Sequence, residues 1–188
     1  MSSDPALYLV SQYMAHSLSL HVQTTTVVDV AAECEVISMA EYLANPVQSV
    51  ALNNPVLFTA SIPCPKGYVY HEDETGIFIL RGITNNCFAR YQLTYNGNIA
   101  IPEGGAVTPI AVAITVNGEP RPTSQAIFTP QAVDEYGNVT STAIITVPKG
   151  CCFSVSVRYV DATVSDPAVT PTPAINVQNS NLVIQRLA

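Results

Sequence analysis

The chain has 188 residues, of which 48% are hydrophobic and only 11% are charged, and its formal net charge is −7. Disordered chains combine low hydrophobicity with high charge, and nucleic-acid-binding chains carry basic surfaces, so this composition argues against both classes. It predicts instead either a large two-layer core or surfaces that are covered by assembly.

The first 48 residues have mixed character, and we expect them to form an arm. Asp4-Pro5 has the form of a helix start. Four apolar residues at helical spacing follow and are candidate anchoring residues: Leu7, Val10, Met14 and Leu18. Residues 21–30 are β-branched and strand-like, whereas residues 38–46 predict a short helix that stops before Pro46. The sequence leaves open whether the arm docks on a partner or packs against its own domain.

The N-terminus and the cysteines bear on localisation. Met1-Ser2-Ser3-Asp4 lacks the basic start of a secretory signal, and no run approaches the ~18 apolar residues of a membrane span. We therefore expect a protein that is made in the cytoplasm and has no membrane partner. The five cysteines contain no C-x-x-C pair, which gives a zinc site or a redox dithiol little support, and we expect buried free thiols. They are Cys34, Cys64, Cys87, Cys151 and Cys152.

From Gly76 onward, short segments with period-two alternation are separated by Gly, Pro and Asn, which is typical of an all-β sandwich or barrel. In residues 87–101, for example, Tyr91, Leu93 and Tyr95 fall on one face. Further strand-like segments are 50–58, 76–82, 109–117, 137–148, 151–160 and 175–188. Their connections are too short for crossover helices, so we expect about eight to ten antiparallel strands in a jelly roll or a similar sandwich.

Two of these segments are apolar on both faces. Ile110–Val116 alternates large residues with Ala111 and Ala113, and the last segment contains Leu182-Val183-Ile184. A strand that is apolar at consecutive positions is expected to be covered on both sides. The protein's own core can cover one side, and the other side needs a second layer.

Three stretches carry a family resemblance: NIAIPEGGAVTPIAVAITVNGEPRP (98–122), STAIITVPKGCCFSVSV (141–157) and INVQNSNLVIQRLA (175–188). Their order resembles the trimeric jelly roll of the tumour necrosis factor and complement globular-head superfamily. More closely, it resembles a bacterial and phage branch, which includes the C-terminal domain of collagen-like spore-surface glycoproteins and the capsid-decoration or head-fibre proteins of tailed phages. The resemblance covers about residues 49–188, with QSVALNNPVLFT (48–59) matching the opening strand.

The resemblance implies an all-β, antiparallel jelly-roll β-sandwich that forms a homotrimer through its inner sheets. It makes Leu182, Ile184, Ala111 and Ala113 candidate trimer-interface residues. The chain has only 9 glycines and no Gly-X-Y tract, so a short arm replaces the collagen stalk.

The missing stalk favours a capsid-decoration or head-fibre protein on the capsid exterior. In this interpretation residues 1–48 bind the major capsid protein and residues 49–188 form the trimerisation domain. The alternative is an adhesion module that binds a host surface glycan or another receptor on a phage or a spore.

Signals for catalysis are missing from the sequence. It contains no G-x-S-x-G, H-E-x-x-H, P-loop or dinucleotide-binding motif, so we expect no enzyme activity and no cofactor. Residues 71–76 (HEDETG) can supply oxygen ligands for calcium, but their spacing favours a solvated turn. Tyr68, Tyr70 and Tyr136, in expected loops, are the aromatic candidates for sugar binding.

Overall fold

A computed structural model describes residues 39–62, 67–162 and 170–188 of the chain. The predicted anchoring residues Leu7, Val10, Met14 and Leu18, together with Cys34 and Cys64, lie outside the described residues. The compact unit that contains the described residues runs from Ile37 to Ala188.

The described residues form twelve strands and one short 3-10 helix. The elements are β1 (Met39–Ala44), β2 (Gln48–Ala51), β3 (Thr59–Ile62), β4 (Val69–His71), β5 (Phe78–Arg81), β6 (Phe88–Ala100), β7 (Ile110–Val116), β8 (Glu119–Pro120), η2 (Pro122–Ser124), β9 (Ala126–Phe128), β10 (Gly137–Pro148), β11 (Cys152–Val160) and β12 (Ala174–Arg186). Within the described ranges, no helix is long and apolar enough to cross a membrane.

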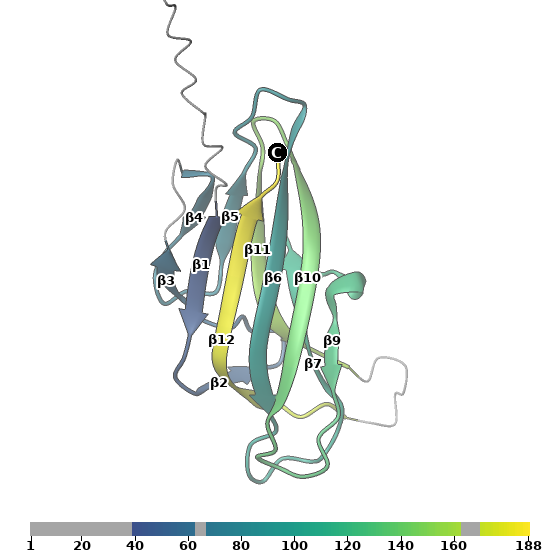
Figure 1. The fold of residues 1–188 in the computed structure, drawn as a ribbon. Coiled ribbons are helices and arrows are strands. Elements are labelled where there is room, and N and C mark those ends of the chain that lie inside the picture. Colours follow the sequence, from purple (N-terminus) through teal and green to yellow (C-terminus); the bar gives the residue numbers. More distant parts are fainter. Residues whose placement is uncertain (1–38, 63–66, 163–169) are drawn as a thin grey trace, which may run out of the picture. The chain divides into compact units, whose positions relative to one another are not determined.

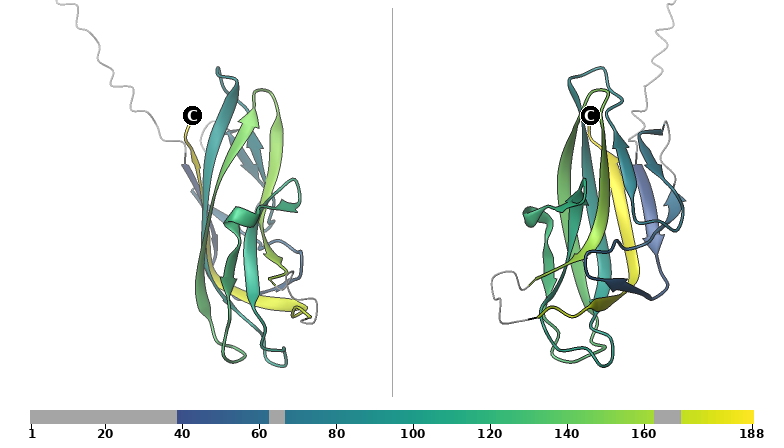
Figure 2. Two further views of the ribbon diagram at one scale, coloured as in Figure 1. Left: turned by 90° about the vertical axis from the view of Figure 1, so that its right-hand side faces the viewer. Right: turned by 180° about the vertical axis from the view of Figure 1, so that it is seen from behind.

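The strands form two sheets that pack face to face (Figures 1 and 2). Sheet A has the order β10-β6-β12-β1-β3, with β2 also paired to β12, and sheet B has the order β4-β5-β11-β7-β8, with β9 paired to β7. Every named pair is antiparallel. The expected fold class, an all-β antiparallel jelly-roll sandwich, is confirmed.

The core lies between the sheets and is built by period-two alternation. On β6 the residues Tyr91, Leu93 and Tyr95 are fully buried, as expected from the sequence. Burial of large side chains such as these, at about 25 cal/mol per Å² of apolar area, is the main term that holds the layers together. β7 is buried on both faces: its large residues join the main core, and Ala111 and Ala113 form a second small cluster with Val160.

The predicted helix at residues 38–46 is wrong, because Met39–Ala44 forms strand β1. Ala40, Tyr42 and Ala44 are buried while the residues between them are not, and this is the alternation of a strand. β1 pairs with both β12 and β3, so tertiary pairing outweighs the helical propensity of the segment. The sandwich therefore begins before the boundary that was expected at residue 49.

β12 contains a β-bulge that reverses which residues face the core. Before the bulge the buried residues are Ile175 and Val177, and after it they are Ser180, Leu182 and Ile184. The pairing of β12 with β6 shifts register between Gln178 and Asn181, and Asn179 has a φ of 47°. A bulge inserts an extra residue in this way and exchanges the two faces of the strand beyond it.

The C-terminus is tied into sheet A. The backbone N–H of Leu187 donates to the carbonyl of Arg90 at 2.8 Å, and the N–H of Arg90 donates to the carbonyl of Ala188 at 3.0 Å. The pairing of β12 with β6 thus continues to the last residue. This pairing explains in part why the closing segment is so apolar, because half of its side chains are core.

The described cysteines differ from expectation. Cys87, Cys151 and Cys152 are free thiols, but all three are exposed, so the expected burial is wrong for them. Cys87 immediately precedes β6, and Cys151 and Cys152 lie at the start of β11. They are therefore at strand ends, where the second sheet does not cover the chain.

We expect stability to fall at alkaline pH because of two core tyrosines. Burial raises the pKa of Tyr95 to about 12, opposed by a hydrogen bond from Ser180, and burial together with the charge of Asp161 raises the pKa of Tyr159 to about 12. In the unfolded chain these phenols ionise near pH 10. The free energy of unfolding should therefore be intact below about pH 10 and decrease between about pH 10 and 12. Urea denaturation across this range tests the expectation, and a flat profile up to pH 12 would contradict it.

Candidate functional site on the outer face of sheet A

The structure does not gather the four predicted interface residues on one surface. Leu182 and Ile184 point into the core of the chain, each with 1% of its surface exposed. Ala111 and Ala113 lie on β7 of the other sheet and are also fully buried. None of the four is available to a neighbouring subunit in the folded chain, and trimer formation itself stays a prediction.

The side chains on the outer face of sheet A are the alternate residues of its long strands. On β12 beyond the bulge these are Asn181, Val183 and Gln185, which lie opposite Asn96, Thr94 and Gln92 of β6. We call the outward residues of β10, β6 and β12 the sheet A face. It consists of Asn138, Thr140, Thr142, Ile144, Thr146, Pro148, Phe88, Arg90, Gln92, Thr94, Asn96, Asn98, Ala174, Asn176, Gln178, Asn181, Val183 and Gln185.

The sheet A face is almost free of charge. Arg90, near the start of β6, is its one charged side chain, and the rest are amides, hydroxyls and apolar residues. Glu41 of the adjacent strand β1 borders the face, where its carboxylate accepts a hydrogen bond from Asn181 at 3.5 Å. Exposed protein surfaces usually carry about 25–35% charged residues with both signs interspersed. The interior of protein interfaces, in contrast, is depleted of charged side chains. This face is therefore poor in charge, as is the chain as a whole, of which 11% of residues are charged.

A network of amide hydrogen bonds orders the centre of this face. The side-chain nitrogen of Asn138 on β10 donates to the side-chain oxygens of Asn96 at 3.2 Å and Asn98 at 3.1 Å on β6. The nitrogen of Asn96 donates in turn to the hydroxyl of Thr140 at 2.9 Å. Cross-strand pairs of this kind stabilise a sheet. They also fix the amide positions before any partner arrives, which lowers the entropy cost of binding.

The acidic turn at residues 71–76 acts as a local structural element. The carboxylate of Asp73 accepts the backbone N–H of Ala60 at 3.0 Å, and the hydroxyl of Thr75 donates to the carbonyl of Glu72 at 2.6 Å. Within the described ranges, no group of three or more His, Cys, Asp or Glu side chains is arranged to hold a metal ion. These contacts favour the solvated-turn interpretation of this segment.

The three candidate tyrosines for sugar binding lie on two different parts of the chain. Tyr68 and Tyr70 lie at the start of β4, where the guanidinium of Arg186 stacks 3.8 Å from the ring centre of Tyr68. Tyr70 is 53% exposed. Tyr136 immediately precedes β10 and is 37% exposed. No contact brings Tyr136 to the other two among the described residues, so these rings do not form a common platform.

Sequence reasoning did not identify the sheet A face, although one signal for it was present. The residues that alternate with the core positions of β6 and β10 are Gln, Thr and Asn in nearly unbroken series. Lys and Glu, which are common on solvent-exposed strand faces, are absent from these positions of β6 and β10. On β12 the signal is hidden, because the bulge shifts the alternation.

Comparisons with known proteins support the fold alone. No family model and no curated protein matches the chain. Among solved structures, it is similar to the globular domain of zebrafish complement 1qA, with 12% identity, a TM-score of 0.53, and coverage of 81% of this chain and 98% of that one. It is similar to the Eiger tumour necrosis factor of S. frugiperda, with 13% identity, a TM-score of 0.55, and coverage of 81% and 93%.

Murine APRIL gives a third match, with 11% identity, a TM-score of 0.50, and coverage of 80% of this chain and 99% of that one. The described residues therefore form a jelly roll of the tumour necrosis factor and complement C1q type. This likeness extends over nearly the whole length of the three matched chains.

Substitutions at two adjacent positions of β12 should show which side chain lies in the core and which lies on the sheet A face. Ile184→Asp places a carboxylate in the core and is expected to lower the free energy of unfolding by at least about 3 kcal/mol. Val183→Asp places the same group on the sheet A face and should leave the chain folded. Circular dichroism and urea denaturation of both variants provide the measurement. A folded Ile184→Asp beside an unfolded Val183→Asp would show that the bulge register is wrong.

Proposed function

We propose that this chain is a structural protein that forms a homotrimer through the sheet A face. The observation that carries the proposal is the lack of Asp, Glu and Lys on the outward positions of three adjacent long strands. Neutral amides and hydroxyls cost less to remove from water than charges, and they can hydrogen-bond to the same groups on a symmetry mate. The proposed role requires no chemical reaction.

The aliphatic residues on the face supply a hydrophobic contribution. Ile144 on β10 is 60% exposed in the single chain, and Val183 lies on β12, on the other side of β6. A standard interface buries about 800 Å² per partner, and apolar area contributes about 25 cal/mol per Å². Association costs remove a large share of this gain, so a trimer of this kind depends on many well-fitted contacts.

The finer proposal is a capsid-decoration or head-fibre protein of a tailed phage, on the capsid exterior. It is supported by the sequence resemblance and by the lack of a collagen tract among the 9 glycines. In this proposal the trimer projects outward and the N-terminal residues bind the major capsid protein. Because β1 belongs to the sandwich, we assign the anchoring role to residues 1–36.

Two matched isoleucines provide the test of trimer formation. Ile144 on the sheet A face and Ile127 on β9 of sheet B are 60% and 56% exposed in the single chain. Ile144→Asp should convert a trimer to monomers, because it places three carboxylates in a dry interface. Ile127→Asp should leave the trimer intact. Sedimentation equilibrium of both variants measures the outcome, and a monomeric wild-type protein would overturn the proposal.

Deletion of residues 1–36 separates assembly from anchoring. The shortened chain keeps all twelve described strands, so it should fold and still form trimers. It should no longer co-sediment with capsids built from the phage's major capsid protein. If the shortened chain still bound capsids, the sandwich itself would carry the contact and the role assigned to the N-terminal residues would be wrong.

A further inference from the structure

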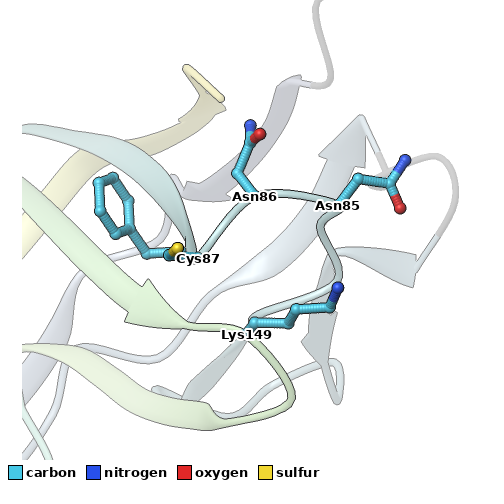
Figure 3. Close-up of a pocket in the computed structure, with 5 residues that line it drawn as sticks. Asn85, Asn86, Cys87 and Lys149 are labelled. Carbon is cyan, nitrogen blue, oxygen red and sulfur yellow. The ribbon is translucent and has the colours of Figure 1, made fainter.

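An open hollow of about 560 Å³ lies at one end of the sandwich, where β10 ends and β6 begins. It is lined by Asn85, Asn86, Cys87, Phe88 and Lys149. The side chain of Lys149 extends from its turn toward the segment that carries Asn85 and Asn86 (Figure 3). The hollow is open to solvent, so a ligand would lie along its surface and would not be enclosed.

The walls of the hollow are held by backbone hydrogen bonds between two turns. The N–H of Lys149 donates to the carbonyl of Cys87 at 2.9 Å, and the N–H of Gly150 donates to the carbonyl of Gly82 at 3.0 Å. The N–H of Gly82 donates to the carbonyl of Cys151 at 2.8 Å. A Cβ at Gly82 would overlap the carbonyl of Pro148, so the two turns pack without space between them. The hollow is therefore a preformed feature of the fold.

The end of the sandwich that carries the hollow is basic, although the chain as a whole has a net charge of −7. Strand pairing and ring stacking place four described segments at this end: 67–70, 80–92, 146–153 and 184–188. Their charged side chains are Arg81, Arg90, Lys149 and Arg186, which are four of the 7 basic residues in the chain. No Asp or Glu occurs in these segments. Arg186 stacks on Tyr68 and its Nε donates to an oxygen of Ala188 at 3.2 Å, and Arg90 lies over the ring of Phe88. Lys149 is therefore the basic side chain that lines the hollow itself and can attract an anion.

The lining also contains groups that suit a sugar. Asn85 and Asn86 border the hollow, but their side-chain amides point away from Lys149 (Figure 3). Phe88 is 38% exposed, and the guanidinium of Arg90 lies 5.0 Å from its ring centre. A partly exposed ring held in this way offers an apolar surface to the C–H face of a pyranose. Lys149 supplies an ammonium group that can pair with a carboxylate or a phosphate.

We infer that this hollow binds an acidic saccharide, with Lys149 on the anionic group and Phe88 on the ring. The inference goes beyond the proposed structural role and rests on one chain alone. Phe88 lies at the edge of the sheet A face, so the hollow borders the proposed trimer contact. Absence of saccharide binding would still leave the trimer proposal unaffected, because sedimentation tests the trimer separately.

Calorimetric titration of the full chain tests the inference with three probes. A hyaluronate tetrasaccharide carries carboxylates, mannose 6-phosphate carries a phosphate on a pyranose, and maltotetraose is the neutral control. At least one acidic probe should bind and maltotetraose should not. Lys149→Ala should weaken that binding by about tenfold or more, whereas Lys149→Arg should retain it. Arg121→Ala, at an exposed arginine remote from the hollow, should have no effect.

A thiol-labelling experiment places the bound saccharide at the hollow. Cys87 lines the hollow and Cys152 does not, yet both are exposed free thiols. Saturating acidic probe should slow the alkylation of Cys87 by iodoacetamide and leave the rate at Cys152 unchanged, as read by peptide mass spectrometry. Equal binding of a tetraglutamate peptide would indicate non-specific attraction of anions and would overturn the inference. So would binding that Lys149→Ala leaves intact.

Discussion

The register of β12 is the constraint on which the rest of the structure depends. This strand pairs with β1 and β2 on one side and with β6 on the other, so it fixes the positions of most of sheet A. A slip of one residue would exchange Leu182 and Ile184 for Asn181 and Val183 in the core. The bulge prevents this, and the 3.1 Å hydrogen bond between the hydroxyls of Tyr95 and Ser180 holds it in place. Core and outer face are thus set together by one local feature.

Assembly through a neutral polar face differs from assembly through an apolar face in what the single chain exposes to water. Its amides can remain in water in the single chain, so the unassembled protein does not expose a large hydrophobic patch. Once covered, each amide must find a partner, because an unpaired buried amide costs about 1–3 kcal/mol. The network between Asn96, Asn98 and Asn138 already satisfies part of this demand within one subunit. Such a face would contribute more to the correct alignment of the subunits than to the strength of their binding.

The sequence predicts the long strands well, because alternation on β6 and β10 runs through more than ten residues without interruption. It fails where local pattern and long-range pairing disagree. Residues 38–46 have helical propensity, yet pairing with β12 makes them a strand. On β12, continuing the alternation of Ile175 and Val177 past residue 179 places Leu182 and Ile184 on the wrong face, because no sequence pattern marks the bulge. The hollow is still harder to predict from the sequence, because residues 85–88 and Lys149 lie far apart in the chain and come together only where two turns meet.

The two proposed contacts meet at one end of the sandwich, and this arrangement has an energetic consequence. The sheet A face runs along the strands, and the hollow lies at the end of β6, where Phe88 belongs to both. A trimer would carry three hollows, so a repeating acidic polysaccharide could engage more than one of them at the same time. The second and third contacts would then be intramolecular, with effective concentrations that raise the overall affinity by about 10²–10⁴ without any new contact. A weak site on each chain is therefore sufficient for firm attachment, provided that the sheet A face holds the three chains together.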